Sequence, residues 1–338
     1  MASLNDVANL AGVSKGTVSR VLNNKGYLSQ ETREKVYSAV KQLNYRTDIA
    51  ALSRLGTKFS TIGLLVPDIC YPHFSSLALC IESELSKHGY RMILCNTLNS
   101  ARLGIDNLEI FQHGPIDGLI LCDRTVSDEE LESLRQPIVS VDRYAHSGIS
   151  TVSSDHPVSG EMAAKLLIAC GCRHVLQTVG SGAQGSPWNE RHAVFEKTLK
   201  SHGVECHTHF RDVLRISDIA FNRQQIREQL AMYPDVDGYF ANDICCIAAI
   251  EEAKALGRRI PEDFQVISCD GTYLSEIFSP HITTIRQPVE RIAAWAVDTI
   301  CRLIEDPTIE SCDVQLKSTL IERETTRRST RQPCGPGR

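Results

Sequence analysis

The sequence predicts an α/β protein with a small three-helix head followed by two lobes, each built on a doubly wound parallel sheet. Apolar residues at helical spacing fill residues 4–43. From Thr61 onward, fully apolar strand segments alternate with amphipathic helical segments, which is typical of parallel sheets covered on both faces. The alternation occurs as two blocks, so we expect two sheets with a cleft between them.

The head is predicted to contain two short helices joined by a tight turn, and a third helix behind them. Residues 4–11 form a helix that Gly12 ends in the left-handed conformation. Ser14 caps a second helix, and the capping signal "SQET" at Ser29 opens a third that runs to Leu43. Two helices separated by a glycine-containing turn form a helix-turn-helix. The inner faces carry small apolar side chains: Leu4, Val7, Ala8, Ala11, Val18, Val21 and Leu22.

The body follows the pattern of two sheets with helical crossovers. A late strand at Thr283–Gln287 and a long helix over Val289–Glu305 follow the two blocks. Ligands of such sheets bind outside the carboxyl ends of the strands. The strands are predicted at Thr61–Val66, Tyr90–Cys95, Asp117–Cys122, Pro137–Asp142, His174–Val179, Asp237–Asn242 and Phe264–Asp270.

Composition changes set the expected domain boundaries. The segment "RTDIAALSRLGTK" between head and body has room for a short helix capped by Asp48, and a helix of that length is marginal alone in water. The tail is rich in Pro, Gly and Arg, and we expect it to be disordered. We predict a head over 1–46, a hinge or linker over 47–60, a first lobe over about 61–157 plus 289–318, a second lobe over about 158–288 plus 319–330, and a tail over 331–338.

Charge and cysteine usage narrow the function classes. Residues 1–60 hold nine Lys/Arg against four Asp/Glu, a net charge of +5; because the whole chain carries −5, the remainder carries −10. A basic head on an acidic body favours a polyanionic partner for the head. No signal peptide or membrane span is predicted, so we expect a cytoplasmic protein. The thirteen cysteines include no C-x-x-C pair, and "CHTH" at Cys206–His209 is interpreted as an edge strand, so no metal is expected.

Several motifs together resemble the lactose-repressor (LacI/GalR) family of transcription factors. These are "LNDVANLAGVSKGTVSRVLN", "SQETREKV" and "LNY" in the head, and "IGLLVPD" at the start of the body. The likeness covers residues 3–330, and "VSSDHPVSGEMAA" and "SCDGTYL" are most similar to sucrose- and ribose-operon regulators. The resemblance implies lobes like those of periplasmic binding proteins, a homodimer, double-stranded operator DNA as partner and a small sugar or sugar phosphate as effector.

The second helix carries the expected DNA contacts. Lying in the major groove, it would bring Lys15 and Arg20 to guanine edges, and Gly16 would let the backbone come close. The resemblance also implies phosphate contacts from short hydroxyl and amide side chains: Ser14, Thr17, Ser19 and Asn23. The hinge departs from the family pattern, because Arg54 stands where the family has a leucine that enters the minor groove, and Leu55 follows it. Either Leu55 wedges into the groove or Arg54 reads it electrostatically.

The expected effector contacts lie at strand ends. An arginine, carboxylates and an amide beside an aromatic ring suit the recognition of sugar hydroxyls. By likeness to the family we predict contacts from Phe74, Asp155, Arg191, Asn242 and Asp270, with Gln287 as a further member. Asp155 and Asp243 precede helices, so a purely capping role stays open for both.

The sequence leaves open three alternatives to a sugar-controlled repressor: an enzyme, an exported solute-binding protein and a regulator with another effector. "GSGAQG" at Gly180–Gly185 matches a dinucleotide fingerprint and suggests an NAD-dependent oxidoreductase, but the loop continues through Ser186 and Pro187 before the helix begins. An exported solute-binding protein would share the lobes, although not the basic head. Within the family, a phosphocarrier protein or a purine-type corepressor would replace the sugar. We predict a sugar-controlled repressor that is not an enzyme and uses no cofactor.

Overall fold

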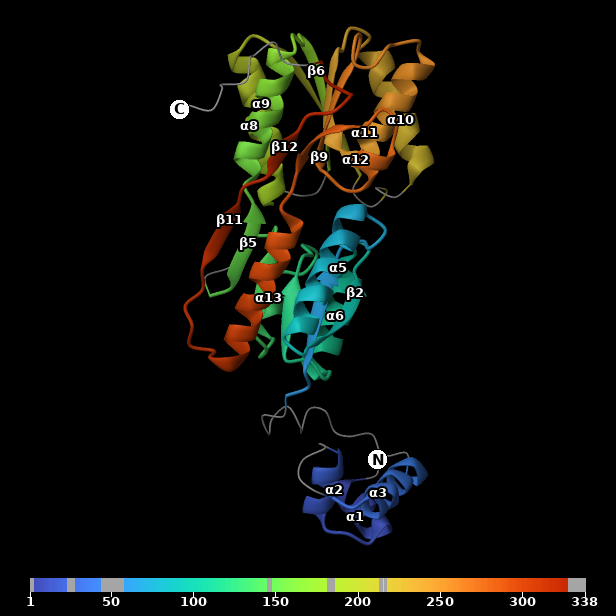
Figure 1. Ribbon diagram of the computed structural model, residues 1–338, viewed down its shortest axis with the longest axis vertical. Helices are drawn as coiled ribbons and strands as arrows, with labels where there is room; N and C mark the ends of the chain where they lie inside the picture. The colour runs from blue at the N-terminus through green and yellow to red at the C-terminus, as the bar shows by residue number, and fades with distance from the viewer. Residues whose placement is uncertain are drawn as a thin grey trace, which may run out of the picture. The chain divides into compact units, whose positions relative to one another are not determined.

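The computed structural model describes most of the chain, which divides into a small N-terminal unit and a large unit that begins at Phe59 (Figure 1). The described residues are 3–22, 28–43, 58–144, 148–180, 186–212, 215 and 218–327. Most of the predicted linker over 47–60 and all of the predicted tail over 331–338 lie outside them, as do Asn23, Arg54, Leu55 and residues 181–185 of the glycine-rich loop.

The small unit contains the predicted three helices, α1 (Leu4–Ala11), α2 (Lys15–Leu22) and α3 (Gln30–Gln42). Gly12 ends α1 with φ +67°, and the hydroxyl of Ser14 accepts a hydrogen bond from the Thr17 amide at 3.1 Å. Their common core consists of small side chains, which lets short helices pack closely: Val7, Ala8, Ala11, Val18, Val21, Val36 and Ala39. The predicted helix-turn-helix is confirmed.

The first lobe is built on a parallel sheet with the order β11-β5-β4-β3-β1-β2. Its strands are β1 (Thr61–Val66), β2 (Arg91–Asn96), β3 (Gly118–Leu121), β4 (Ile138–Val141), β5 (Ser150–Ser154) and β11 (Asp313–Leu316). Its helices are α5 (Pro72–Lys87), α6 (Ala101–His113), α7 (Asp128–Glu132) and α13 (Val289–Glu305). Neighbouring residues of β1 point to opposite faces, so Leu64 packs toward α5 and α13, and Leu65 packs toward α6.

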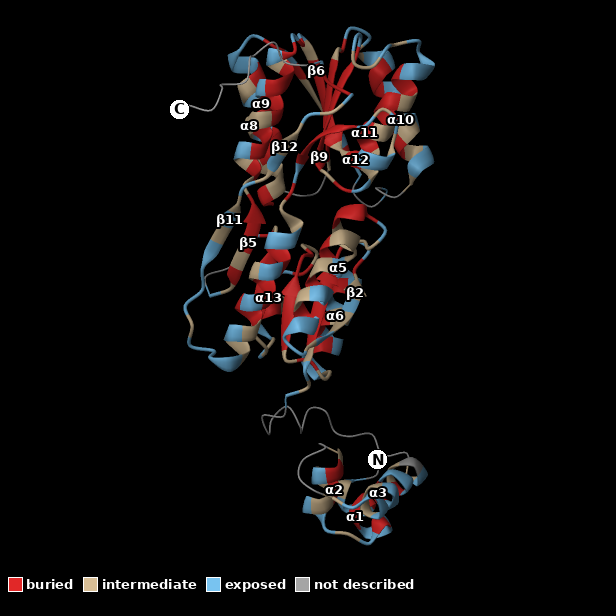
Figure 2. Ribbon diagram, in the orientation of Figure 1, coloured by how far each residue is buried: buried red, intermediate tan, exposed pale blue. Residues whose placement is uncertain are grey.

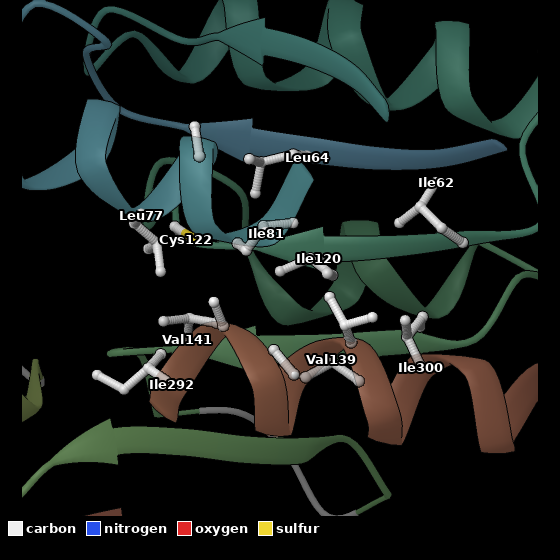
Figure 3. Packing of buried hydrophobic residues seen from close by; sticks show 14 of the residues in the cluster. Ile62, Leu64, Leu77, Ile81, Ile120, Cys122, Val139, Val141, Ile292 and Ile300 are labelled. Atoms are coloured by element: carbon white, nitrogen blue, oxygen red, sulfur yellow. The ribbon is translucent and has the colours of Figure 1, made fainter. Parts of the chain in front are cut away.

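Figure 3 shows the core of the first lobe on the face covered by α5 and α13. Leu77 and Ile81 of α5 face the strands there and are buried, so they belong to this core. Leu79, on the opposite side of the same helix, is 68% exposed. Of these three α5 residues, only Leu79 is therefore available for a contact on the surface of the chain.

The second lobe has a sheet of the order β12-β10-β9-β8-β6-β7, parallel except for β12, which pairs antiparallel with β10. Its strands are β6 (His174–Gly180), β7 (Glu205–Arg211), β8 (Gly238–Asn242), β9 (Gln265–Asp270), β10 (Thr283–Arg286) and β12 (Thr319–Ile321). Its helices are α8 (His156–Ala169), α9 (Pro187–Ser201), α10 (Ile219–Met232), α11 (Asp243–Ala255) and α12 (Leu274–Ile277). The "CHTH" segment lies in β7 at the sheet edge, as predicted.

The two lobes are joined by three passages of the chain, between β5 and α8, between β10 and α13, and between β11 and β12 (Figure 1). The Ser154 hydroxyl donates to Gln287 Oε1 at 2.8 Å, which links the first two passages. The predicted fold class, a helical head with two doubly wound lobes, is confirmed. The sequence did not predict β5, β11 and β12, which are short strands beside the passages.

Burial follows this architecture (Figure 2). In both lobes the central strands and the sheet-facing sides of the helices are buried, whereas the outer sides of the helices and the strands β2, β11 and β12 are exposed or intermediate. No described helix is long and apolar enough to cross a membrane.

Candidate functional site

A pocket lies between the two sheets of the body, at the carboxyl ends of their strands, and its cavity measures about 110 Å³. The first lobe lines it with residues that follow β1, β3 and β4 and with the first turn of α5. The second lobe contributes residues from the ends of β6 to β9, from the segment after β10 and from the start of α9. This is the position in which doubly wound sheets bind their ligands.

Asp270, the last residue of β9, is the polar centre of the pocket. Its carboxylate accepts hydrogen bonds from Tyr71 Oη of the first lobe and from Gln287 Nε2, and Arg191 Nη1 lies 3.5 Å away. Its backbone has φ +115°, a sparsely populated region that costs about 1–3 kcal/mol. The surrounding contacts hold this conformation and fix the direction of the carboxylate.

Arg191 on α9 reaches the pocket because α8 and α9 pack closely. A Cβ atom added to Gly160 of α8 would lie 2.0 Å from the Arg191 carbonyl oxygen, so no larger residue fits at this position. The Arg191 side chain is nine-tenths buried, and its Nε has no hydrogen-bond partner. Groups of this kind inside a pocket are available to the oxygens of a ligand.

Asp142, which follows β4 of the first lobe, and His156, the first residue of α8, form a second polar pair. Asp142 Oδ1 lies 2.9 Å from His156 Nε2 and accepts from the Ser154 amide at 3.1 Å. Burial disfavours the charged carboxylate, but His156 and the hydrogen bonds outweigh it and lower the pKa of Asp142 to about 2. Asp142 is therefore ionised at neutral pH.

Aromatic rings from both lobes supply the apolar part of the pocket. Phe74 of α5 packs edge-on against Tyr71, with ring centroids 5.8 Å apart. Trp188 enters from the start of α9, and the Arg124 guanidinium lies over its ring at 4.5 Å. Burial lowers the pKa of Arg124 to about 10, and its Nη1 donates to Ser186 Oγ at 2.7 Å. Ring faces beside hydrogen-bonding groups suit a small polyhydroxylated ligand.

Most of the predicted effector residues lie in this pocket. Phe74, Arg191, Asn242, Asp270 and Gln287 line it. Asp155 does not; its carboxylate accepts from the Val158 amide at 3.2 Å and caps α8. Asn242 also caps a helix, because its side chain accepts from the Cys245 amide at 2.9 Å. Capping and pocket lining are thus compatible for Asn242.

Sequence reasoning missed several lining residues: Arg124, Asp142, His156, Trp188 and Arg211. Asp142 is the last residue of the predicted strand "PIVSVD", and Arg211 is the last residue of β7. The rule that directed attention to other strand ends would have found both of them. Trp188 and Arg124 follow loops, and no sequence pattern placed them.

The predicted DNA-contacting residues lie on the outer side of α2 and at its start. Ser14, Lys15, Gly16 and Arg20 are exposed, and Thr17 and Ser19 are half-buried. A Cβ atom at Gly16 would meet nothing closer than Ser14 Oγ at 3.8 Å, so the fold of the head does not itself require glycine there. Asn23, Arg54 and Leu55 lie outside the described residues.

Comparison with known proteins places the chain in a family. Residues 3–48 match the model "Bacterial regulatory proteins, lacI family", and residues 164–326 match "Periplasmic binding protein-like domain". The ribose operon repressor of Halalkalibacterium halodurans is 32% identical over 97% of this chain and 98% of its own length. The sucrose operon repressor of Streptococcus mutans is 35% identical over 90% of this chain and 93% of its own length. The chain belongs to the LacI family of bacterial regulators, as the sequence motifs predicted.

Solved structures agree with this assignment. The transcriptional regulator CelR, in complex with cellobiose, has a TM-score of 0.70 at 26% identity and covers 96% of this chain and 100% of its own. A LacI-type regulator from Alkaliphilus metalliredigens, in complex with D-xylulofuranose, has a TM-score of 0.71 at 28% identity. The match covers 79% of this chain and 99% of that regulator. The lac repressor dimer bound to operator shares the fold, with a TM-score of 0.71 at 23% identity.

Proposed function

We propose that this chain is a repressor of carbohydrate-utilisation genes whose affinity for operator DNA is set by a small sugar or sugar derivative in the pocket. The observation that carries the proposal is the pocket itself. Aromatic rings and fixed hydrogen-bonding groups from both lobes meet there, in a member of a family of DNA-binding regulators. The names of the relatives, ribose and sucrose operon repressors, support a sugar as effector.

In this proposal the pocket binds a sugar through two kinds of contact. Phe74 and Trp188 pack against the ring faces, and Asp270, Arg191 and Asn242 bind hydroxyl groups. Gln287 holds Asp270 in place. Since the pocket draws residues from both lobes, a bound sugar stabilises one arrangement of the lobes relative to another.

The head acts by placing α2 in the major groove. Lys15 and Arg20 bind base edges, Gly16 allows close approach of the backbone, and the hydroxyls of Ser14, Thr17 and Ser19 bind phosphates. Asn23 joins these contacts, and in the linker either Leu55 enters the minor groove or Arg54 reads it electrostatically. In a homodimer, two heads bind half-sites about one helical turn apart. Such a regulator works on chromosomal DNA in the cytoplasm, and neither catalysis nor a cofactor belongs to this role.

A binding experiment tests the proposal. Duplexes selected from a random library by the wild-type chain are titrated with wild type, Arg20→Gln and the control Lys35→Gln, which removes one charge from the exposed face of α3. We expect Arg20→Gln to weaken binding roughly ten- to one-hundred-fold. The control should lie within about threefold of wild type, as expected for a charge away from the bases.

The same titration with ribose, sucrose and their phosphates tests the control of DNA binding. A coupling free energy of about 1–3 kcal/mol would change operator affinity about 5- to 150-fold. If no duplex is enriched over random competitor DNA at low salt, the chain does not have the proposed function.

A further inference from the structure

Arg211, the last residue of β7, is a buried arginine inside the pocket. It pairs in the sheet with Gly180 of β6, lines the pocket and is only 4% exposed. Its Nη1 donates to Asn222 Oδ1 at 2.8 Å and to Cys245 Sγ at 2.9 Å. An amide and a buried thiol are weak counterparts for a full positive charge, and Arg211 Nε has no partner at all.

Three other charged groups of the pocket have a counter-charge or an aromatic ring beside them. Asp142 pairs with His156, and Asp270 lies beside Arg191. Arg124 has the Trp188 ring beneath its guanidinium and the Ser186 hydroxyl beside it. Within the described part of the chain, no carboxylate lies within 4.0 Å of a side-chain nitrogen of Arg211, and no aromatic ring lies under its guanidinium.

This arrangement is costly in the empty pocket. A buried charge without a counter-charge loses its hydration without an equivalent gain. A lysine or a carboxyl group escapes this cost by losing its charge, but the pKa of arginine is so high that its guanidinium stays protonated in proteins. The missing partner of Arg211 is therefore a negative charge, which a ligand of the pocket can supply because Arg211 lines it.

The neighbouring strand ends suit the same ligand group. Thr178 of β6 and Asn242 of β8 also line the pocket, and β6 lies between β7 and β8 in the sheet. The Thr178 hydroxyl already donates to Gln229 Oε1 at 3.2 Å, so the Arg211 guanidinium and the Asn242 amide nitrogen are the donors that these strand ends offer to an anion. The planar guanidinium matches the oxygen pairs of a phosphate or a carboxylate.

We infer that the effector carries an acidic group, a phosphate or a carboxylate, and that Arg211 binds its oxygens. The inference rests on the proposed function, since it assigns a charge to the sugar derivative in the same pocket. The aromatic rings and the Asp270 cluster hold the polyhydroxylated part, and Arg211 holds the anion. Arg211 thus selects a sugar phosphate or a sugar acid over the neutral sugar.

The test compares matched ligands on the full-length chain. Wild type, Arg211→Gln and Arg227→Gln are titrated with glucose, glucose 6-phosphate and glucuronate, ribose and ribose 5-phosphate, and sucrose and sucrose 6-phosphate. Inorganic phosphate against chloride at constant ionic strength serves as the simplest anion. Arg227→Gln is the control, because Arg227 is an exposed arginine of the same lobe. Binding is measured by calorimetry and by the shift of the melting temperature, which rises when a ligand binds the folded state.

We expect phosphate to raise the melting temperature of wild type and of Arg227→Gln more than that of Arg211→Gln. In at least one sugar series the acidic member should bind tenfold or more tightly than the neutral one, and Arg211→Gln should weaken it about ten- to one-hundred-fold. Affinity for the neutral member should stay within twofold. The phosphate and glucuronate arms distinguish the two acidic groups.

A further readout separates ligand binding from a structural role. If Arg211 only braces α10 and α11, Arg211→Gln lowers the melting temperature of the ligand-free chain. Our inference expects that temperature to be unchanged or higher, because an uncompensated charge has been removed. Arg211→Lys keeps the charge without the planar fork and should show an intermediate loss of anion affinity. It replaces Arg211→Gln as the tested variant if the latter does not fold.

Two outcomes overturn the inference. One is that phosphate and all acidic sugars shift wild type and the Arg211 variants equally. The other is that a neutral sugar binds more tightly than its acidic counterparts. Operator titration tests the proposed function separately. Release of the operator by a neutral sugar would support the proposed function and contradict the inference about Arg211. Failure to bind any duplex would end the proposed function while the phosphate comparison still tests Arg211.

Discussion

The outer side of α2 and the pocket of the body present their functional groups in opposite ways. On α2, Lys15, Gly16 and Arg20 are exposed, and Arg20 makes one long hydrogen bond of 3.4 Å to the Gly16 carbonyl. In the pocket, Arg191 and Asp270 are buried and held by neighbours from several elements. A substitution on the outer side of α2 should therefore change DNA binding with little effect on stability, whereas a substitution of Arg191 or Asp270 should change both ligand binding and stability.

The largest expected effect comes from removing a buried charge. Arg191→Met leaves Asp270 without its nearby positive charge, and breaking a buried pair in this way costs about 3–5 kcal/mol. We expect chemical denaturation to show a loss at the lower end of this range, because Tyr71 and Gln287 still donate to Asp270. The response of operator binding to the effector should disappear.

A matched control for this variant is Arg302→Met, which removes an arginine from the exposed side of α13. Its stability should change by no more than about 0.5 kcal/mol. Equal stability losses in the two variants would contradict the comparison between buried and exposed charges.

A second prediction concerns pH. Burial and the negative charge of Asp270 raise the pKa of Asp243 to about 7 from 3.8. The folded chain therefore holds a proton that the unfolded chain has lost between about pH 4 and pH 7, and the stability that this proton contributes falls as pH rises through that window. The effect on the free energy of unfolding is at most about 4 kcal/mol.

Asp243→Asn tests this sign. Asparagine keeps an oxygen for the Thr272 amide and hydroxyl but does not titrate. From pH 5 to pH 8, the melting temperature of wild type should fall relative to that of the variant. Asp142, with its pKa near 2, stays ionised throughout this range and does not obscure the comparison. Parallel melting curves across the range would show that Asp243 does not titrate there.

A smaller effect is expected from the close packing of α8 on α9. Gly160→Ala places a methyl group against the Arg191 carbonyl, and overpacking of this kind costs about 1–3 kcal/mol. Because the helix that carries Arg191 must shift, effector affinity should fall along with stability. Thermal unfolding with and without effector measures both, and a variant with unchanged stability and affinity would show that the close approach is not needed.

The smallest stability effect is expected at Gly16, the corresponding glycine of α2. Gly16→Ala meets no atom within ordinary contact distance except Ser14 Oγ, and alanine favours a helix over glycine by about 0.5–1 kcal/mol. The head should become slightly more stable, while operator affinity falls because the added methyl group keeps the backbone away from the bases. Unchanged affinity would mean that the glycine serves no close approach to DNA.

Local signals explain how much of the fold was predictable. The helices of the head follow from the capping residues Ser14 and Ser29 and from Gly12, each of which acts within a few residues of its own position. The apolar strands of both sheets are visible because parallel strands are buried on both faces. The strands β5, β11 and β12 are short and partly polar, and tertiary pairing alone defines them.

The pocket was predictable only where a strand ends. Asp270 and Asn242 stand at the carboxyl ends of apolar strands, whereas Trp188 lies in the first turn of α9 and Arg124 lies beyond the end of β3, where no local pattern marks a pocket residue. Asp155 shows the limit of the rule, because a polar residue between a strand and a helix has the same sequence signature whether it caps the helix or faces a ligand. Burial and hydrogen bonds in the folded chain distinguish the two cases.

Occupation of the pocket by a sugar derivative is expected to change the affinity of the head for operator DNA. The most direct measurement is a fluorescence-anisotropy titration of a selected operator duplex with the full-length chain, with and without the sugar derivative that most raises its melting temperature. We expect operator affinity to change at least fivefold in wild type and less than twofold in Arg191→Met, with both proteins binding equally in the absence of the sugar. An operator affinity in wild type that is the same with the pocket empty and saturated would contradict the claim.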